Sequence, residues 1–157
     1  MTWLTVVVQW IHIVAGLAWL GGYVFLALGL WPALLRRPAA EGRAVWEGME
    51  PSVRPLMMVS GMLVFLAGLV RGTLLGPVRS FGFLFGSAYG LTFLVAALLT
   101  IGLTVYTANA ARATAEKVWD GDGFRPGAAA YVRSSYGLSL VWFAAVLVCM
   151  VLMRFGL

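Results

Sequence analysis

Four apolar runs constrain this chain more than any other feature of its sequence. They cover residues 3–30, 55–75, 81–108 and 131–153. Crossing about 30 Å of hydrocarbon takes roughly 20 helical residues at a rise of about 1.5 Å per residue, so each run approaches or exceeds that length. Only 11% of the 157 residues are charged, against about 25% in an ordinary soluble domain. We therefore predict an all-α integral membrane four-helix bundle, with residues 1–157 forming a single transmembrane domain in the lipid bilayer.

Basic residues are distributed unevenly between the two sides of this predicted bundle. Those in the first and third connections and their flanks are Arg36, Arg37, Arg43, Arg54, Arg112, Lys117, Arg125 and Arg133, and those on the opposite side are Arg71, Arg79 and Arg154. Because basic loops tend to stay in the cytoplasm, we expect connections one and three inside and both termini outside a bacterial inner (plasma) membrane. This topology accounts for the net charge of +5, so we expect no nucleic-acid partner.

The only histidine, His12, lies inside the first run, about nine residues or roughly 13 Å beyond Trp3. Helical spacing places Gly16, Trp19 and Tyr23 on the same face as this histidine. Ionisable groups inside a bilayer are rare and often functional. The stripe is therefore interpreted as a cofactor-binding or metal-binding face. The alternatives are a proton relay or gate, and a hydrogen bond between helices.

A groove of small residues runs beside this stripe. Ala18 and Gly22 form a small-xxx-small pair, and Ala15 lies on the same side of the helix. Such pairs allow another helix, or a flat ligand, to approach the backbone closely. Either occupant is compatible with the sequence.

The residue types around His12 favour heme b over the other metal centres that imidazole serves. Zinc needs three or four nitrogen, sulfur or carboxylate ligands, and the four runs contain no acidic residue. Heme needs one axial histidine, a flat apolar slot and basic groups near its propionates. Arg71 and Arg79 are predicted on the same outer side as His12. They either pair with the propionates or are ordinary interfacial arginines.

Copper is the alternative metal, since it accepts imidazole, thioether and thiolate ligands. Cys149, Met150 and Met153 are predicted near the outer end of the fourth run, closer to the depth of His12 than Met57 is. We therefore expect any metal partner of His12 to be Met150 or Cys149. Packing is the competing role for each methionine.

Polar residues of the third run fall into two sets. Those nearer its cytoplasmic half are predicted to bond back to carbonyls of their own helix; they are Thr100, Thr104 and Thr107. Those nearer the depth of His12 are candidates to bond the second imidazole nitrogen and fix its tautomer; they are Ser87, Tyr89 and Thr92.

The string HIVAGLAWLGG, which begins at His12, resembles the first-helix signature H-xx-A-xxx-W-x-G-G of the copper-resistance D family of bacterial membrane proteins. It is also similar to the first helix of the related heme-dependent protoporphyrinogen oxidases, and MEPSVRPL, from Met49, partly resembles their Met-Glu-Arg-Arg-Leu run. The oxidases also have a functional lysine on the second helix, whereas the only lysine here is Lys117. The resemblance implies copper uptake or tolerance in the first case and heme ligation through His12 in the second.

The leading hypothesis is a heme b-binding membrane protein for electron transfer or porphyrin oxidation, with His12 as axial ligand and Trp19 near the macrocycle. Because each chain has one histidine, bis-histidine ligation requires a homodimer or another membrane redox partner. Otherwise the sixth ligand is Met150, Cys149, water or nothing. The alternatives are a copper-binding transport protein that uses His12 with methionine or cysteine, and a structural subunit of a larger membrane complex. Whether the protein is an oxidoreductase enzyme is left open by the sequence.

Overall fold

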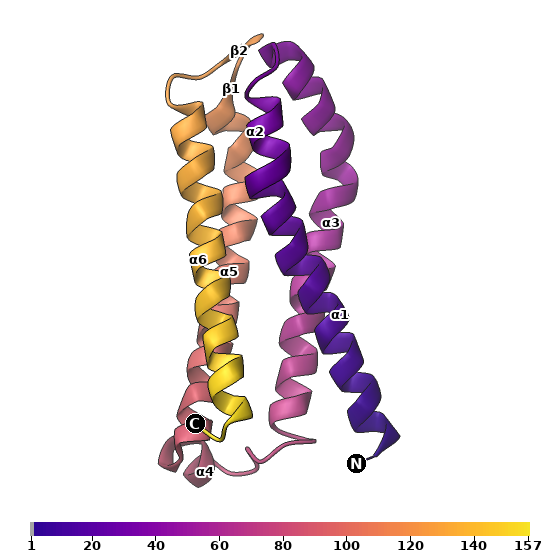
Figure 1. Ribbon diagram of the computed structural model, residues 1–157, viewed down its shortest axis with the longest axis vertical. Helices are drawn as coiled ribbons and strands as arrows, with labels where there is room; N and C mark the ends of the chain where they lie inside the picture. The colour runs from indigo at the N-terminus through magenta and orange to yellow at the C-terminus, as the bar shows by residue number, and fades with distance from the viewer. Residues whose placement is uncertain (1) are drawn as a thin grey trace.

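The computed structural model describes residues 2–157 and is an all-α four-helix bundle with one short β-hairpin (Figure 1). Along the chain its elements are α1 (Trp3–Phe25), the π-helical segment η1 (Leu26–Leu30), α2 (Trp31–Leu34), α3 (Ala39–Gly72), α4 (Phe81–Gly86), α5 (Ala88–Val118), β1 (Trp119–Asp120), β2 (Gly123–Phe124) and α6 (Ala128–Arg154). Four helical stretches are long and apolar enough to cross a membrane, as the sequence predicts.

The first spanning helix is longer than the predicted range of 3–30, because α1, η1 and α2 continue without interruption to Leu34. The backbone widens to π geometry immediately before Pro32, a residue that has no N–H to continue the α-helical hydrogen bonds. Beyond this segment Trp31 is 0% exposed and Leu34 is 2% exposed. The helix therefore keeps a buried face through its last turns.

The second spanning helix differs most from its prediction of 55–75, because α3 begins at Ala39. Residues expected in a loop are helical despite Pro51 and Pro55 inside the helix. The charged residues that suggested a loop form ion pairs one helical turn apart, Arg43 with Glu47 and Glu50 with Arg54. Such pairs support a solvated helix.

The third and fourth spans also have different bounds. The predicted helix 81–108 is divided into α4 and α5, because Ser80 and Ser87 each cap a new helix by accepting a backbone N–H bond. The helix α5 then continues to Val118, and α6 covers Ala128–Arg154 instead of 131–153. The DGDG segment between α5 and α6 forms the turn of the antiparallel β1–β2 hairpin.

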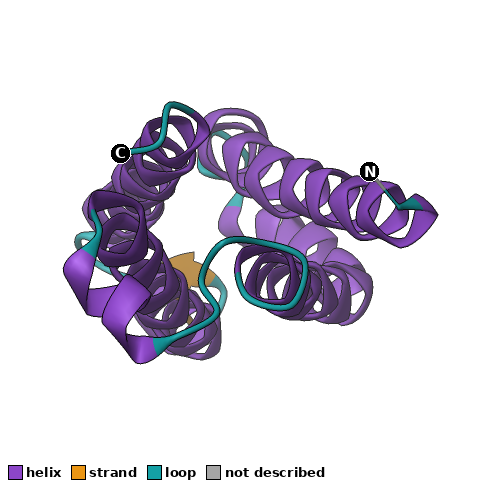
Figure 2. Ribbon diagram, turned by 90° about the horizontal axis from the view of Figure 1, so that it is seen from below, coloured by secondary structure: helices purple, strands orange, loops and turns teal. Residues whose placement is uncertain are grey.

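The bundle consists of two helical hairpins, since α1 packs mainly on α3 and α5 mainly on α6. Both termini and α4 lie at one end, which we call the terminal end, and α2 with β1–β2 lies at the other, which we call the hairpin end (Figure 1). Toward the terminal end α1 leans away from α6 (Figure 1), and the view along the bundle shows how the four long helices are arranged around its axis (Figure 2).

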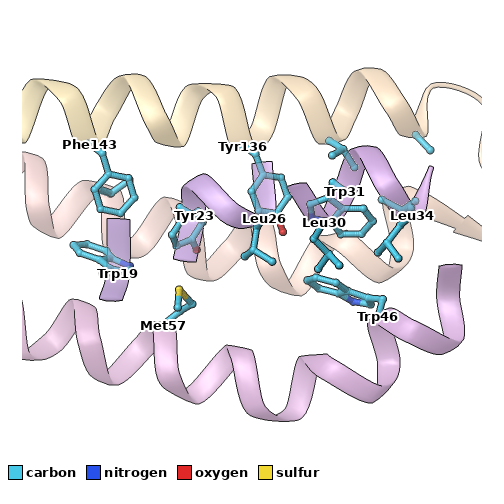
Figure 3. Packing of buried hydrophobic residues seen from close by; sticks show 14 of the residues in the cluster. Trp19, Tyr23, Leu26, Leu30, Trp31, Leu34, Trp46, Met57, Tyr136 and Phe143 are labelled. Atoms are coloured by element: carbon cyan, nitrogen blue, oxygen red, sulfur yellow. The ribbon is translucent and has the colours of Figure 1, made fainter. Parts of the chain in front are cut away.

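Aromatic and aliphatic side chains form a packed cluster in the half of the bundle toward the hairpin end (Figure 3). The ring of Trp19 meets Phe143 edge to face at a centroid distance of 4.8 Å, and Trp31 packs on Trp46 at 4.7 Å. Tyr23 lies between these pairs, 5.5 Å from Phe143. Packing of this kind holds the helices together toward the hairpin end.

Many large apolar side chains point out of the bundle. Leu17 and Val141, for example, are each 67% exposed, and Leu98 is 60% exposed. A water-soluble surface of this size rarely exposes so much contiguous apolar area. Hydrocarbon is the solvent that suits it, which agrees with the four spanning helices.

Candidate functional site

A cavity of about 460 Å³ lies between α1, α3, α5 and α6 in the terminal half of the bundle. We call it the histidine cavity. Its wall includes Gln9 and His12 from α1, Gly68 and Arg71 from α3, Tyr89 and Phe93 from α5, and Met150, Met153 and Arg154 from α6. The outward lean of α1 toward the terminal end leaves room between the helices here.

His12 is held against α3 by a hydrogen bond. Its Nδ1 lies 3.0 Å from the backbone oxygen of Val64. A carbonyl oxygen only accepts, so Nδ1 carries the proton and Nε2 keeps an unshared electron pair. The prediction that a polar residue of the third run makes this bond is wrong, because α3 passes closer to His12. The Val64 carbonyl fixes the tautomer of the imidazole as the predicted polar residue would have done, since one hydrogen bond to a ring nitrogen is sufficient.

Two glycines of α3 make room for aromatic rings beside this site. A Cβ at Gly68 would lie 3.0 Å from Cε1 of His12, and a Cβ at Gly72 would collide with the ring of Phe93. The imidazole therefore lies directly on the helix backbone. Sequence analysis missed both residues, although their spacing of four is the small-xxx-small pattern that permits close approach.

The two arginines predicted near the propionates have different positions. Arg71 is on the cavity wall, where its Nε donates to Oε1 of Gln9 at 3.2 Å. Arg79 is exposed and donates to the carbonyl of Gly76 at 3.2 Å, away from the wall. A second wall arginine, Arg154, comes from α6. The basic groups at this cavity are thus Arg71 and Arg154.

Of the two sulfur residues predicted to accompany His12, the structure brings one to the cavity. Met150 is on the wall, half-buried, together with Met153. Cys149 is 8% exposed and is not on the wall. One residue step on a helix turns a side chain by about 100°, so neighbours in sequence face different directions. Met150 is the sulfur residue that can act with His12.

The predicted stripe on α1 faces the bundle interior but does not form one site. Trp19 and Tyr23 line a second cavity of about 660 Å³, nearer the hairpin end, which we call the arginine cavity. Gly16 is on neither wall, and a Cβ there would lie 3.9 Å from Val64. The grouping of these residues with His12 around one macrocycle is therefore wrong. Phe65 belongs to both walls, so the two cavities are neighbours along the bundle.

The small-residue groove on α1 takes a side chain from α3. A Cβ at Gly22 would collide with the thioether of Met57. Met57 is 9% exposed and is part of the apolar core (Figure 3). Of the two occupants that the sequence left open, the neighbouring helix is the one present.

The threonines of the third spanning helix behave as predicted. Each hydroxyl donates to a carbonyl one turn earlier, Thr100 to Ala96 at 2.7 Å, Thr104 to Thr100 at 2.8 Å and Thr107 to Leu103 at 2.8 Å. This satisfies their polar atoms within the helix.

Within residues 2–157 there is no group of three or more His, Cys, Asp or Glu side chains that could hold a metal ion. A metal near His12 therefore needs thioether ligands or ligands that it brings with it. Comparison of the chain with family models, with curated proteins and with solved structures found no match.

Proposed function

We propose that the protein binds one heme b in the histidine cavity, with His12 as axial ligand to the iron. The observation that carries this proposal is the His12 side chain, which is part of the cavity wall and whose Nδ1 bonds the Val64 carbonyl, so that Nε2 is the nitrogen left to ligate iron. Ligating histidines usually have this second bond, which orients the ring. A porphyrin supplies four ligands itself, so the site needs no further cluster of metal-binding side chains.

The residues present fit such a group. A volume of about 460 Å³ falls within the range of about 300–1,000 Å³ typical of ligand pockets. The rings of Phe93 and Tyr89 give an aromatic wall, and Arg71 and Arg154 supply cations for two propionates. Met150 is on the same wall and would be the candidate for a sixth ligand, and a homodimer that shares heme between two copies of His12 is the alternative.

Heme would supply reversible one-electron transfer. What this chain contributes is the orientation of His12, the apolar wall and the two arginines. By the positive-inside rule, the terminal end is proposed to lie outside a bacterial inner membrane, where an electron-transfer partner or a porphyrin substrate reaches it. Membership of the copper-resistance D or protoporphyrinogen oxidase families is part of the same proposal, supported by HIVAGLAWLGG.

Absorption spectroscopy tests the proposal. The protein purified in detergent after expression with heme supply should show a Soret band that shifts on reduction with dithionite. The band should be lost in His12→Ala and should return when free imidazole is added, because the vacated space accepts it. Return of the band separates loss of the ligand from misfolding. A well-folded wild-type protein that retains no heme after reconstitution overturns the proposal.

Copper is the second candidate, and one observation favours it. His12, Met150 and Met153 are all on the wall of the histidine cavity, and imidazole with thioethers is a suitable ligand set for Cu(I). A colourless protein that binds about one Cu(I) per chain, with loss of binding in Met150→Leu, would select this function. If neither heme nor copper binds, the His12–Val64 bond is a structural contact between helices, as in a subunit of a larger complex.

A further inference from the structure

The arginine cavity has an apolar interior and one charged end. It lies mainly between α1, α3 and α5 near the hairpin end. Its apolar wall includes Leu26, Met58, Met62, Ile101 and Val105. Four of these, Met58, Met62, Ile101 and Val105, are between 46% and 59% exposed. The cavity is therefore open sideways to lipid.

The charged end lies at the expected depth of the lipid headgroups. Arg54 is about 27 Å along α3 from Gly72, and Arg112 is about 36 Å along α5 from Ala88, at 1.5 Å per residue. The hydrocarbon layer is about 30 Å thick. The two arginines thus flank its boundary, and the apolar wall residues Ile101 and Val105 lie within it.

Charge at this end favours an anion. Arg54 forms an ion pair with Glu50, so these two residues together are neutral. Arg112 is exposed and forms no ion pair within residues 2–157. The mouth therefore has one uncompensated positive charge, and Arg54 has further N–H groups that can donate to an anion.

We propose that the arginine cavity binds one anionic glycerophospholipid of the leaflet at the hairpin end. Its phosphate lies between Arg54 and Arg112, and an acyl chain lies along Met58, Met62, Ile101 and Val105. A phospholipid has a charged headgroup at the membrane surface and apolar acyl chains in the hydrocarbon layer. The cavity has its arginines and its apolar wall at these same two depths. This binding does not depend on heme, since His12 is not on the wall of this cavity.

Native mass spectrometry of the detergent-purified protein tests the proposal. The protein is titrated with phosphatidylglycerol and, separately, with phosphatidylcholine of the same acyl chains. We expect one tightly retained phosphatidylglycerol, bound at least fivefold more tightly than phosphatidylcholine. One basic residue near an anionic headgroup contributes about this factor. Equal retention of the two lipids overturns the proposal.

Matched variants locate the site. Arg112→Gln should lower phosphatidylglycerol affinity about fivefold, whereas Arg133→Gln, an exposed arginine of α6 outside the cavity wall, should leave it unchanged. Val105→Trp should fill the apolar part and abolish retention of the lipid, and Val141→Trp on the outer face of α6 should not. Equal effects within either pair would show that the bound lipid lies elsewhere. Thermal unfolding in detergent checks that each variant is folded, whether or not the protein binds heme.

Discussion

At the scale of single residues, the contact between His12 and Gly68 constrains the position of the ligand in the candidate heme site. The imidazole has one bond to the Val64 carbonyl and lies against the α3 backbone, where a methyl group would be 3.0 Å from Cε1. Such a contact is tighter than ordinary van der Waals packing, so the ring must shift by a few tenths of an ångström if a methyl group is added.

Gly68→Ala is therefore expected to weaken the site without removing the ligand. The added methyl should displace His12, lower heme retention and destabilise the protein by about 1–3 kcal/mol. Gly21→Ala on α1 is the control, because a Cβ there meets nothing within 4 Å. Heme titration and thermal unfolding in detergent measure the two effects. Equal behaviour of the two variants would mean that His12 is free to move.

The two outer arginines give a second prediction at this scale. Arg71→Gln should lower heme affinity about tenfold while the Soret maximum stays in place, because a charge-assisted bond to a propionate is lost and the iron ligand is kept. Arg79→Gln should bind heme as the wild type does, since its side chain lies off the cavity wall. Reversed effects in a heme titration would contradict the assignment of Arg71.

At the scale of elements, α3 contains prolines that a helix interior does not favour. Pro51 and Pro55 each lack the N–H that would bond the carbonyl four residues earlier, and each ring crowds that carbonyl. They lie beside Glu50 and Arg54, at the charged end of the arginine cavity. The prolines therefore shape the wall where we place the lipid phosphate.

Pro51→Ala should stabilise α3, by at most about 3 kcal/mol, and should change phosphatidylglycerol affinity. Pro126→Ala in the loop before α6 is the contrasting variant. There, loss of a proline that is outside any helix should lower stability by about 0.4–1 kcal/mol through the unfolded chain. Thermal unfolding gives the sign of each change in stability. A destabilised Pro51→Ala protein would mean that the local helix geometry imposed by Pro51 is required for packing.

The extent of α3 shows where sequence reasoning stops. Apolar runs predict the part of each helix that lies in hydrocarbon, and all four were found near their predicted places. The part of α3 beyond the apolar run is supported by ion pairs such as Arg43–Glu47 instead. Gly48 and Pro51 in the same stretch are typical of loops, so the sequence did not predict a helix there. Burial by neighbouring helices then outweighs local propensity.

The candidate site was predictable to a similar degree. Helical periodicity correctly placed His12, Trp19 and Tyr23 toward the bundle interior. Helical periodicity gives no information on where the space between two helices widens. In the structure that spacing places His12 and Trp19 on the walls of different cavities. Partners from other helices, such as the Val64 carbonyl, depend on how α1 crosses α3, which no single helix encodes.

At the scale of the whole molecule, the orientation in the membrane is a prediction from charge. The terminal end and the hairpin end are far apart along the bundle (Figure 1), and the excess of basic residues lies toward the hairpin end. The positive-inside rule places that end in the cytoplasm.

Single cysteines test this orientation in intact cells. In a Cys149→Ala background, Leu74→Cys near the terminal end should react with a membrane-impermeant maleimide. Asp122→Cys in the β1–β2 turn should react only after the cells are opened. Leu74 is 73% exposed and Asp122 is also exposed, so both positions are accessible to the reagent. Labelling of the turn in intact cells would reverse the proposed topology.

Both ends of the chain contribute residues to the wall of the histidine cavity. Gln9 and His12 lie within the first turns of α1, and Met150, Met153 and Arg154 lie within the last turns of α6. An affinity tag or fluorescent fusion on either terminus would therefore be tethered next to the site under study. The β1–β2 turn at Gly121–Asp122 is exposed and at the opposite end. It is the better position for a purification handle when ligand binding is to be measured.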